Sequence, residues 1–143
     1  MTFTVSGTSG LTFPDTSTQS TGYSSSTNAT FNTVSDSIGN VRSIPVNSQT
    51  SAYVVAASDN GKVISITTGG VTINNSIMSA GQVVTIYNNS GSSQTITQGT
   101  GVTLQWAGQS ASTTGNRTLG LYGMATVLFL SASSAVITGS GLT

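Results

Sequence analysis

The chain has 143 residues, of which only six are charged at neutral pH, three Lys or Arg and three Asp, so its formal net charge is zero. Charged residues make up 4% of the sequence, against about 25% in an ordinary soluble domain, and the absence of His and Cys excludes His/Cys metal sites and His-dependent catalytic triads. Three scattered cations form no basic stripe for nucleic acid, and the longest apolar run, Met124 to Leu130, is far shorter than the roughly 20 residues that span a bilayer. We therefore expect a non-enzymatic protein that needs no cofactor and binds neither nucleic acid nor a membrane.

Residues 1–40 are predicted to form an extended arm. Ser, Thr, Asn and Gly dominate this stretch, and its apolar residues are isolated from one another, so it cannot close a core of its own. We expect one or two short strands that dock on another surface by strand addition, a mode in which alternate side chains are the anchors. The expected anchors are Phe3, Val5, Leu11 and Phe13.

From residue 41 onward, short stretches rich in Val, Ile and Thr alternate with turn residues, which predicts β-strands. Residues 53–56 and 62–67 flank Ser58-Asp59-Asn60-Gly61, in which Gly61 can adopt the positive φ of a tight hairpin. The same pattern predicts two further hairpins, formed by residues 82–87 with 94–97 around Asn88-Asn89-Ser90-Gly91, and by residues 124–131 with 135–138.

The strand Ala125 to Leu130 is uncharged and apolar at nearly every position. An exposed edge of this kind pairs with other copies of itself. We therefore expect a central strand that is covered on both faces, by an opposite sheet or by a neighbouring subunit.

The fold class predicted from these strands is all-β. No window of a dozen residues carries apolar positions at helical spacing without interruption by Gly or β-branched residues. We expect a β-sandwich of about eight strands, jelly-roll-like or immunoglobulin-like, over residues 41–143, preceded by the extended arm of residues 1–40.

The few charged side chains have structural interpretations. Arg117 lies in a polar loop segment, and its fork of donors is expected to satisfy loop carbonyls in preference to a partner carboxylate. Lys62 could pair with Asp59 across the predicted hairpin, although an exposed pair contributes only about 0–1 kcal/mol. A calcium site could use Asp15, Asp36 or Asp59, but the sequence has no EF-hand-like ligand spacing.

Three aromatic residues, Tyr87, Trp106 and Tyr122, admit two interpretations. Together they could form a platform on which a sugar stacks. More often such residues are core or interface anchors, and we favour the packing role.

Two stretches resemble proteins of tailed bacteriophages. Residues 10–19, Gly-Leu-Thr-Phe-Pro-Asp-Thr-Ser-Thr-Gln, resemble the G-[IL]-T-F-P-D-G-[ST]-x-Q segment of phage structural and tail-fibre proteins, with Thr16 where Gly is usual. The stretch from about residue 44 to 143 is similar to a β-domain of virion structural proteins, notably of phages of cyanobacteria and other aquatic bacteria. The residues that carry this similarity are 58–66, 84–90, 95–104, 115–119 and 136–142.

The resemblance implies a non-enzymatic, usually trimeric, β-rich component exposed on the particle. Two roles fit. One is a capsid decoration (cement) protein, a homotrimer on the outer surface of the phage head that clamps neighbouring capsomers of the major capsid protein. The other is a tail-fibre or spike module that binds a host surface glycan.

We expect the cement role. A fibre usually has a long shaft or a coiled-coil trimeriser together with a tail-attachment domain, and residues 1–143 show neither. A compact body with an arm of about 40 residues suits a clamp, because the arm can reach across a capsomer seam. A bacterial surface repeat is a third interpretation, but it would need a secretion signal, and the sequence shows none.

Overall fold

The structure is a computed structural model, and it describes residues 11–12, 18–19, 35, 41, 43–110 and 113–143. The chain divides into two units, residues 1–33 and residues 34–143. In the first unit, β1 (Leu11–Thr12) and β2 (Thr18–Gln19) form a two-stranded antiparallel sheet in which Leu11 pairs with Gln19. Phe3, Val5 and Phe13 lie outside the described residues.

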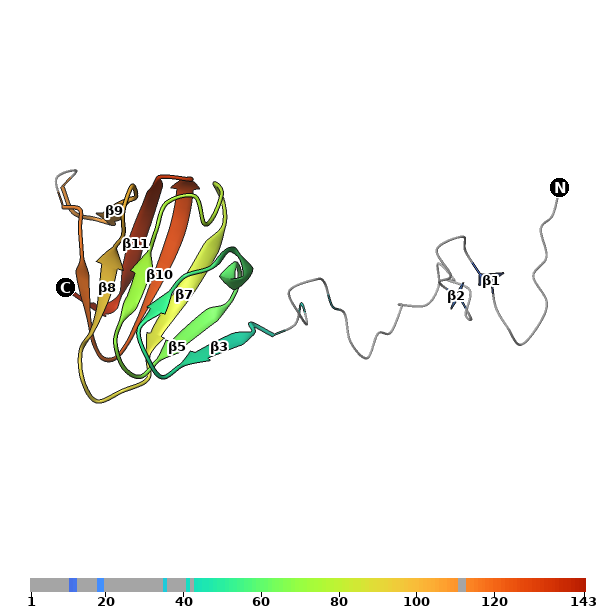
Figure 1. The fold of residues 1–143 in the computed structure, drawn as a ribbon, viewed down its shortest axis with the longest axis horizontal. Helices are drawn as coiled ribbons and strands as arrows, with labels where there is room; N and C mark the ends of the chain where they lie inside the picture. Colours follow the sequence, from blue (N-terminus) through green and yellow to red (C-terminus); the bar gives the residue numbers. More distant parts are fainter. Residues whose placement is uncertain (1–10, 13–17, 20–34, 36–40, 42, 111–112) are drawn as a thin grey trace. The chain divides into compact units, whose positions relative to one another are not determined.

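The second unit is almost entirely strand, which confirms the all-β class (Figure 1). One short 3-10 helix, η1 (Ala57–Asp59), interrupts the strands of its described part. The strands are β3 (Val46–Gln49), β4 (Tyr53–Val54), β5 (Val63–Ile66), β6 (Val71–Ile73), β7 (Val83–Asn88), β8 (Gln94–Gln98), β9 (Thr103–Trp106), β10 (Arg117–Ser131) and β11 (Ser134–Leu142).

Within the described residues these nine strands form one continuous, nearly closed sheet built from two parallel ladders. The first ladder is β3-β5-β7, in which Val46 pairs with Val63 and Val63 with Thr85. The second ladder is β4-β6-β8, in which Tyr53 pairs with Val71 and Val71 with Ile96. Each turn of the chain therefore adds one strand to each ladder, which differs from the antiparallel connections of jelly-roll and immunoglobulin sandwiches.

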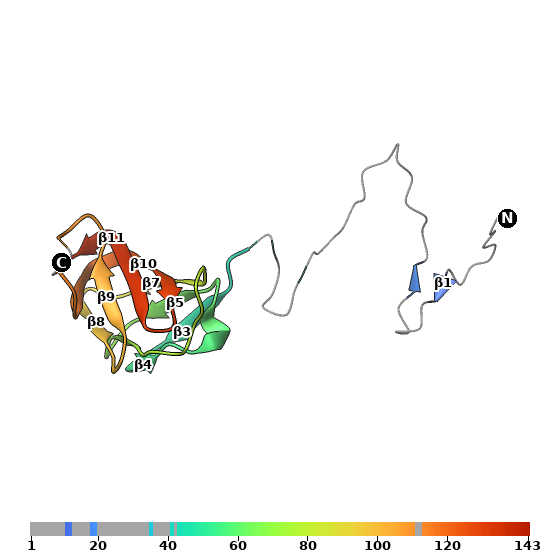
Figure 2. The ribbon, with the colours of Figure 1, turned by 90° about the horizontal axis from the view of Figure 1, so that it is seen from above.

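The long strand β10 joins the two ladders. Its first residues, Arg117 to Leu119, pair with β8, and residues 124–128 pair with β7, both antiparallel. Between these segments the strand bends at residues 120–123, where Tyr122 has a φ of +53°. Its other edge pairs with β11, and β11 pairs in parallel with β9. Figure 2 shows the resulting curled arrangement from above.

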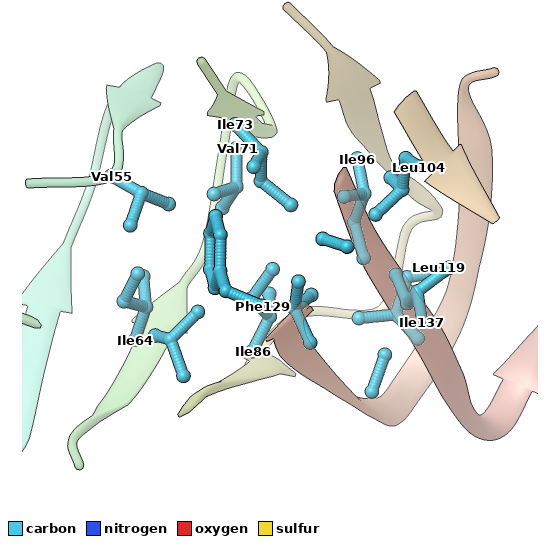
Figure 3. Packing of buried hydrophobic residues seen from close by; sticks show 14 of the residues in the cluster. Val55, Ile64, Val71, Ile73, Ile86, Ile96, Leu104, Leu119, Phe129 and Ile137 are labelled. Carbon is cyan, nitrogen blue, oxygen red and sulfur yellow. The ribbon is translucent and has the colours of Figure 1, made fainter. Parts of the chain in front are cut away.

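The core lies between the two ladders. Its residues are mainly Ile, Val and Leu that alternate with outward residues along each strand, as the pleat requires. Figure 3 shows Phe129 at the centre, with Ile64 and Ile86 of the first ladder and Val71 and Ile73 of the second around it. All five side chains are buried almost completely.

Two of the three predicted hairpins are wrong. β4 and β5 flank the turn around Gly61 but belong to different ladders, and the same is true of β7 and β8 around residues 89–91. Gly61 has the expected positive φ, +75°, yet the turn sends the chain to the other ladder. The hairpin of β10 and β11 is confirmed, with Ser131 paired to Ser134.

Candidate functional site

The described surface carries an apolar patch on the outer side of β10. Ala125, Val127 and Phe129 point into the core, so the alternate residues point outward. Among these, Met124 is 53% exposed, Leu128 40% and Leu130 52%. The prediction that this strand is central is confirmed, since β7 and β11 cover its two edges. Of the expected cover on both faces, the core supplies one, and among the described residues Met124, Leu128 and Leu130 on the other face are exposed.

The outward residues of the three neighbouring strands form one surface, which we call the β10 face. It consists of Val83, Thr85 and Tyr87 on β7, Met124, Thr126, Leu128 and Leu130 on β10, and Val136 and Thr138 on β11. Figure 1 shows these three strands side by side. All nine side chains are exposed or partly exposed.

Strand register arranges the β10 face in rows that run across the three strands. Leu128 pairs with Val83 on one side and Val136 on the other, which gives an apolar row. Thr126 pairs with Thr85 and Thr138, which gives a threonine row. The hydroxyls of Thr85 and Thr126 lie 3.4 Å apart, within hydrogen-bonding distance.

The β10 face carries no charge, and little charge lies anywhere on the described surface. Asp59 and Arg117 are buried, which leaves Lys62, partly exposed, among the described charged side chains. Contacts made through this surface therefore depend on apolar burial and on hydroxyl or backbone hydrogen bonds, both of which salt screens little.

Asp59 is buried in a polar cluster that ties the start of the second unit together. Its carboxylate accepts hydrogen bonds from Asn47 Nδ2 at 2.8 Å, the Tyr53 hydroxyl at 2.8 Å and the backbone N–H of Ala56 at 2.9 Å. Burial raises the pKa of Tyr53 above its ordinary value of 10.0, and the hydrogen bond to Asp59 raises it further. No ion pair between Lys62 and Asp59 is present in the described part of the chain.

Arg117 satisfies loop carbonyls, as predicted. Its Nη1 donates to the carbonyl of Asn116 and its Nη2 to that of Thr113, each at 2.8 Å. The guanidinium also lies over the ring of Trp106, 5.3 Å from the centroid. The buried guanidinium therefore holds the loop between β9 and β10 together and is not available to a binding partner.

The structure does not place the three candidate aromatic residues on one platform. Trp106 packs against the hydrophobic core and beneath Arg117. Tyr87 lies on the β10 face, next to Met124 in the register. Tyr122 is 63% exposed at the bend of β10. For Trp106 the packing role describes what is observed, whereas Tyr87 and Tyr122 are available for contacts.

Other expected features are found only in part among the described residues. Of the four expected arm anchors, Leu11 lies in β1, and Asp15 and Asp36 lie outside the described residues together with the remaining anchors. The described ranges contain no group of three or more His, Cys, Asp or Glu that could hold a metal ion. No helix in the described part of the chain is long and apolar enough to cross a bilayer.

Comparison of the chain with protein-family models, curated proteins and solved structures found no match.

Two buried polar residues, Asn88 and Gln94, are not among the residues that the sequence patterns single out. Asn88 is completely buried, and its Nδ2 donates to the carbonyls of Ser92, Leu119 and Gly120. Gln94 links the backbone N–H of Gly70 to the carbonyl of Thr67. Asn and Gln are common in surface turns, so nothing local in the sequence distinguishes these two from the exposed ones.

Proposed function

We propose that this chain is a non-enzymatic structural protein of a tailed-phage particle, and that it acts as a homotrimeric decoration (cement) protein on the outer surface of the head. The observation that carries the proposal is the β10 face, an uncharged surface of the described β-domain on which Met124, Leu128 and Leu130 are exposed side by side with the outward residues of β7 and β11. Apolar patches of this kind mark sites of protein association. The resemblance of residues 10–19 and 44–143 to phage virion proteins is the reason for proposing a phage particle as the assembly.

In this proposal the body and the arm have separate tasks. The body, residues 41–143, would form the trimer, and the arms, residues 1–40, would dock on neighbouring copies of the major capsid protein. A single arm contact can be weak, because three arms per trimer raise the effective concentration of each at its site. Packaged DNA pushes capsomers apart, so a clamp across the seam adds kinetic resistance to opening.

The glycan-binding alternative has less support from the geometry. A sugar-stacking platform needs aromatic faces that share one exposed surface. Trp106, the largest of the three candidates, lies against the core beneath Arg117, and its ring face on that side is covered. The described residues therefore support protein association more than carbohydrate binding.

The experiment that tests the proposal is quantitative mass spectrometry of fractionated particles from cells that carry the gene. DNA-filled heads should contain the protein in hundreds of copies, with few or none in the tail fraction. Its presence in tails alone would instead support the fibre role, and its absence from both fractions would overturn a virion role.

A second test separates the arm from the body. Deletion of residues 1–20 should abolish binding to heads that lack the protein, while the circular dichroism of the body remains unchanged. Stoichiometric binding by the truncated protein would show that the arm is not the docking element.

A further inference from the structure

We propose that copies of this chain associate through the β10 face, and that this face forms the centre of the subunit interface. The inference rests on the proposed function for the number of copies, but the choice of surface depends on the structure alone.

The two sides of β10 differ in how they are covered. Both sides of β10 from residue 124 to 130 are rich in large apolar residues, and only one side is buried by the core. Soluble monomers rarely expose large continuous apolar patches. The row Val83-Leu128-Val136 extends the patch over three strands, so it is more than a single exposed leucine.

The pairing of β10 within the sheet determines how a partner can contact it. β7 and β11 already pair with both edges of this segment of β10, so its backbone groups are satisfied within the sheet. A partner must therefore pack against the face and not add a strand to it. The threonine row lies inside the patch, and the hydroxyls of Thr85 and Thr126 are within hydrogen-bonding distance of each other. The two hydroxyls can stay hydrogen-bonded to each other when another protein covers the face, which limits the free-energy cost of burying them.

The lack of charge on the β10 face favours a second copy of the chain as the partner. A charged partner, such as a nucleic acid or an acidic protein, would lose solvation at this face and find no opposite charge in exchange. Another copy presents the same uncharged surface. In a cyclic assembly whose axis runs along β10, each row meets the same row of its neighbour, so the Leu128 row packs on itself and the Thr126 row on itself.

The test combines a charge variant with a matched control. Leu128→Lys places a cation on the β10 face, and Val54→Lys places one at a residue that is 53% exposed on β4 of the second ladder. Light scattering should show a wild-type oligomer at micromolar concentration, a dissociation constant raised at least a hundredfold by Leu128→Lys, and no change with Val54→Lys. Both variants should keep the wild-type circular dichroism.

The absence of Cys from the chain allows a direct second readout. Thr126→Cys at the centre of the face should form covalent dimers with a short bismaleimide, whereas Thr95→Cys, exposed on β8, should not. A wild-type monomer at 100 μM, or an oligomer that Val54→Lys dissociates and Leu128→Lys does not, would overturn the proposal.

Two further outcomes are decisive. A monomer in which the cysteine of Thr126→Cys is protected from maleimide would show that another part of the same chain covers the face, which would also overturn the proposal. The outcome for the face and the outcome for the proposed function are separable. An oligomer that forms through the β10 face but is absent from phage heads would contradict only the proposed function. An oligomer that is found in hundreds of copies on heads and that Leu128→Lys leaves intact would contradict only this inference.

Discussion

The hydroxyl of Tyr53 donates a hydrogen bond to Asp59 Oδ2 at 2.8 Å, and this contact joins β4 to the end of η1. Asn47 of β3 donates to both residues, to the Tyr53 hydroxyl at 3.0 Å and to Asp59 Oδ1 at 2.8 Å. The first strands of the two ladders are thus linked through one buried carboxylate. The cluster lies where the chain passes between the two ladders.

Tyr53→Phe should destabilise the domain by about 1.5–3 kcal/mol, because it removes a hydrogen bond to a buried charged group. Urea unfolding followed by circular dichroism measures the change. Tyr122→Phe is the matched control, since this side chain is 63% exposed, and it should stay within about 0.5 kcal/mol of the wild type. Equal effects of the two substitutions would show that the cluster does not stabilise the fold.

The same tyrosine predicts a pH dependence. Because the pKa of Tyr53 is raised in the folded state, the unfolded chain loses this proton at lower pH than the folded one. The stability that this difference contributes is complete below about pH 10 and is lost as the pH rises through the folded pKa. Unfolding midpoints measured from pH 8 to 11 should therefore fall more steeply for the wild type than for Tyr53→Phe. Parallel curves would contradict the assignment.

Arg117→Lys should destabilise the loop between β9 and β10 by about 1–3 kcal/mol, because an ammonium cannot replace the planar fork that reaches two carbonyls and stacks on a ring. Trp106 is the single tryptophan of the chain, so its fluorescence reports on the site directly. A shift of the emission maximum to longer wavelength is expected as the ring becomes solvated. Lys62→Met removes a different cation and should leave the emission unchanged. An unaltered spectrum for Arg117→Lys would count against the stacked geometry.

Gly139→Ala should destabilise the hairpin of β10 and β11 by about 2–4 kcal/mol, a magnitude typical of overpacking against backbone. A Cβ at Gly139 would collide with the Met124 carbonyl and the backbone of Ala125. Gly91→Ala is the control, because its Cβ would meet only the Tyr122 hydroxyl at an ordinary distance of 3.8 Å. Thermal unfolding of the pair should show a large drop for the first and little for the second. Similar unfolding midpoints for the two variants would show that β10 and β11 can move apart at Gly139 without a loss of stability.

The sequence patterns predict the strands of this protein better than their pairing. Alternation along residues 124–131 and the turn after Ser131 are local features, and they correctly predict the hairpin of β10 and β11. The turns after β4 and β7 contain the same kinds of residue. Next to the second of these turns, Asn88 donates to the carbonyls of Leu119 and Gly120, which lie 31 and 32 residues away in the sequence. No local pattern shows that these groups will meet.

The β10 face could be predicted from the sequence in one respect. An apolar run such as Ala125–Leu130 shows that both sides of a strand need cover, but it does not show which side the core supplies. That choice depends on the register of β10 against β7 and β11, and a shift by one residue would exchange the two faces. The structure resolves this by burying Ala125, Val127 and Phe129 and leaving Met124, Leu128 and Leu130 outside.

Sedimentation equilibrium of the wild-type protein at 50 mM and at 1 M NaCl tests whether copies associate through the uncharged β10 face, because such association does not depend on ion pairs that salt would screen. We expect a closed oligomer with the same or tighter association at high salt, and its loss in Leu128→Lys under both conditions. A monomer at 100 μM, or an oligomer that dissociates as the salt concentration rises, would contradict it.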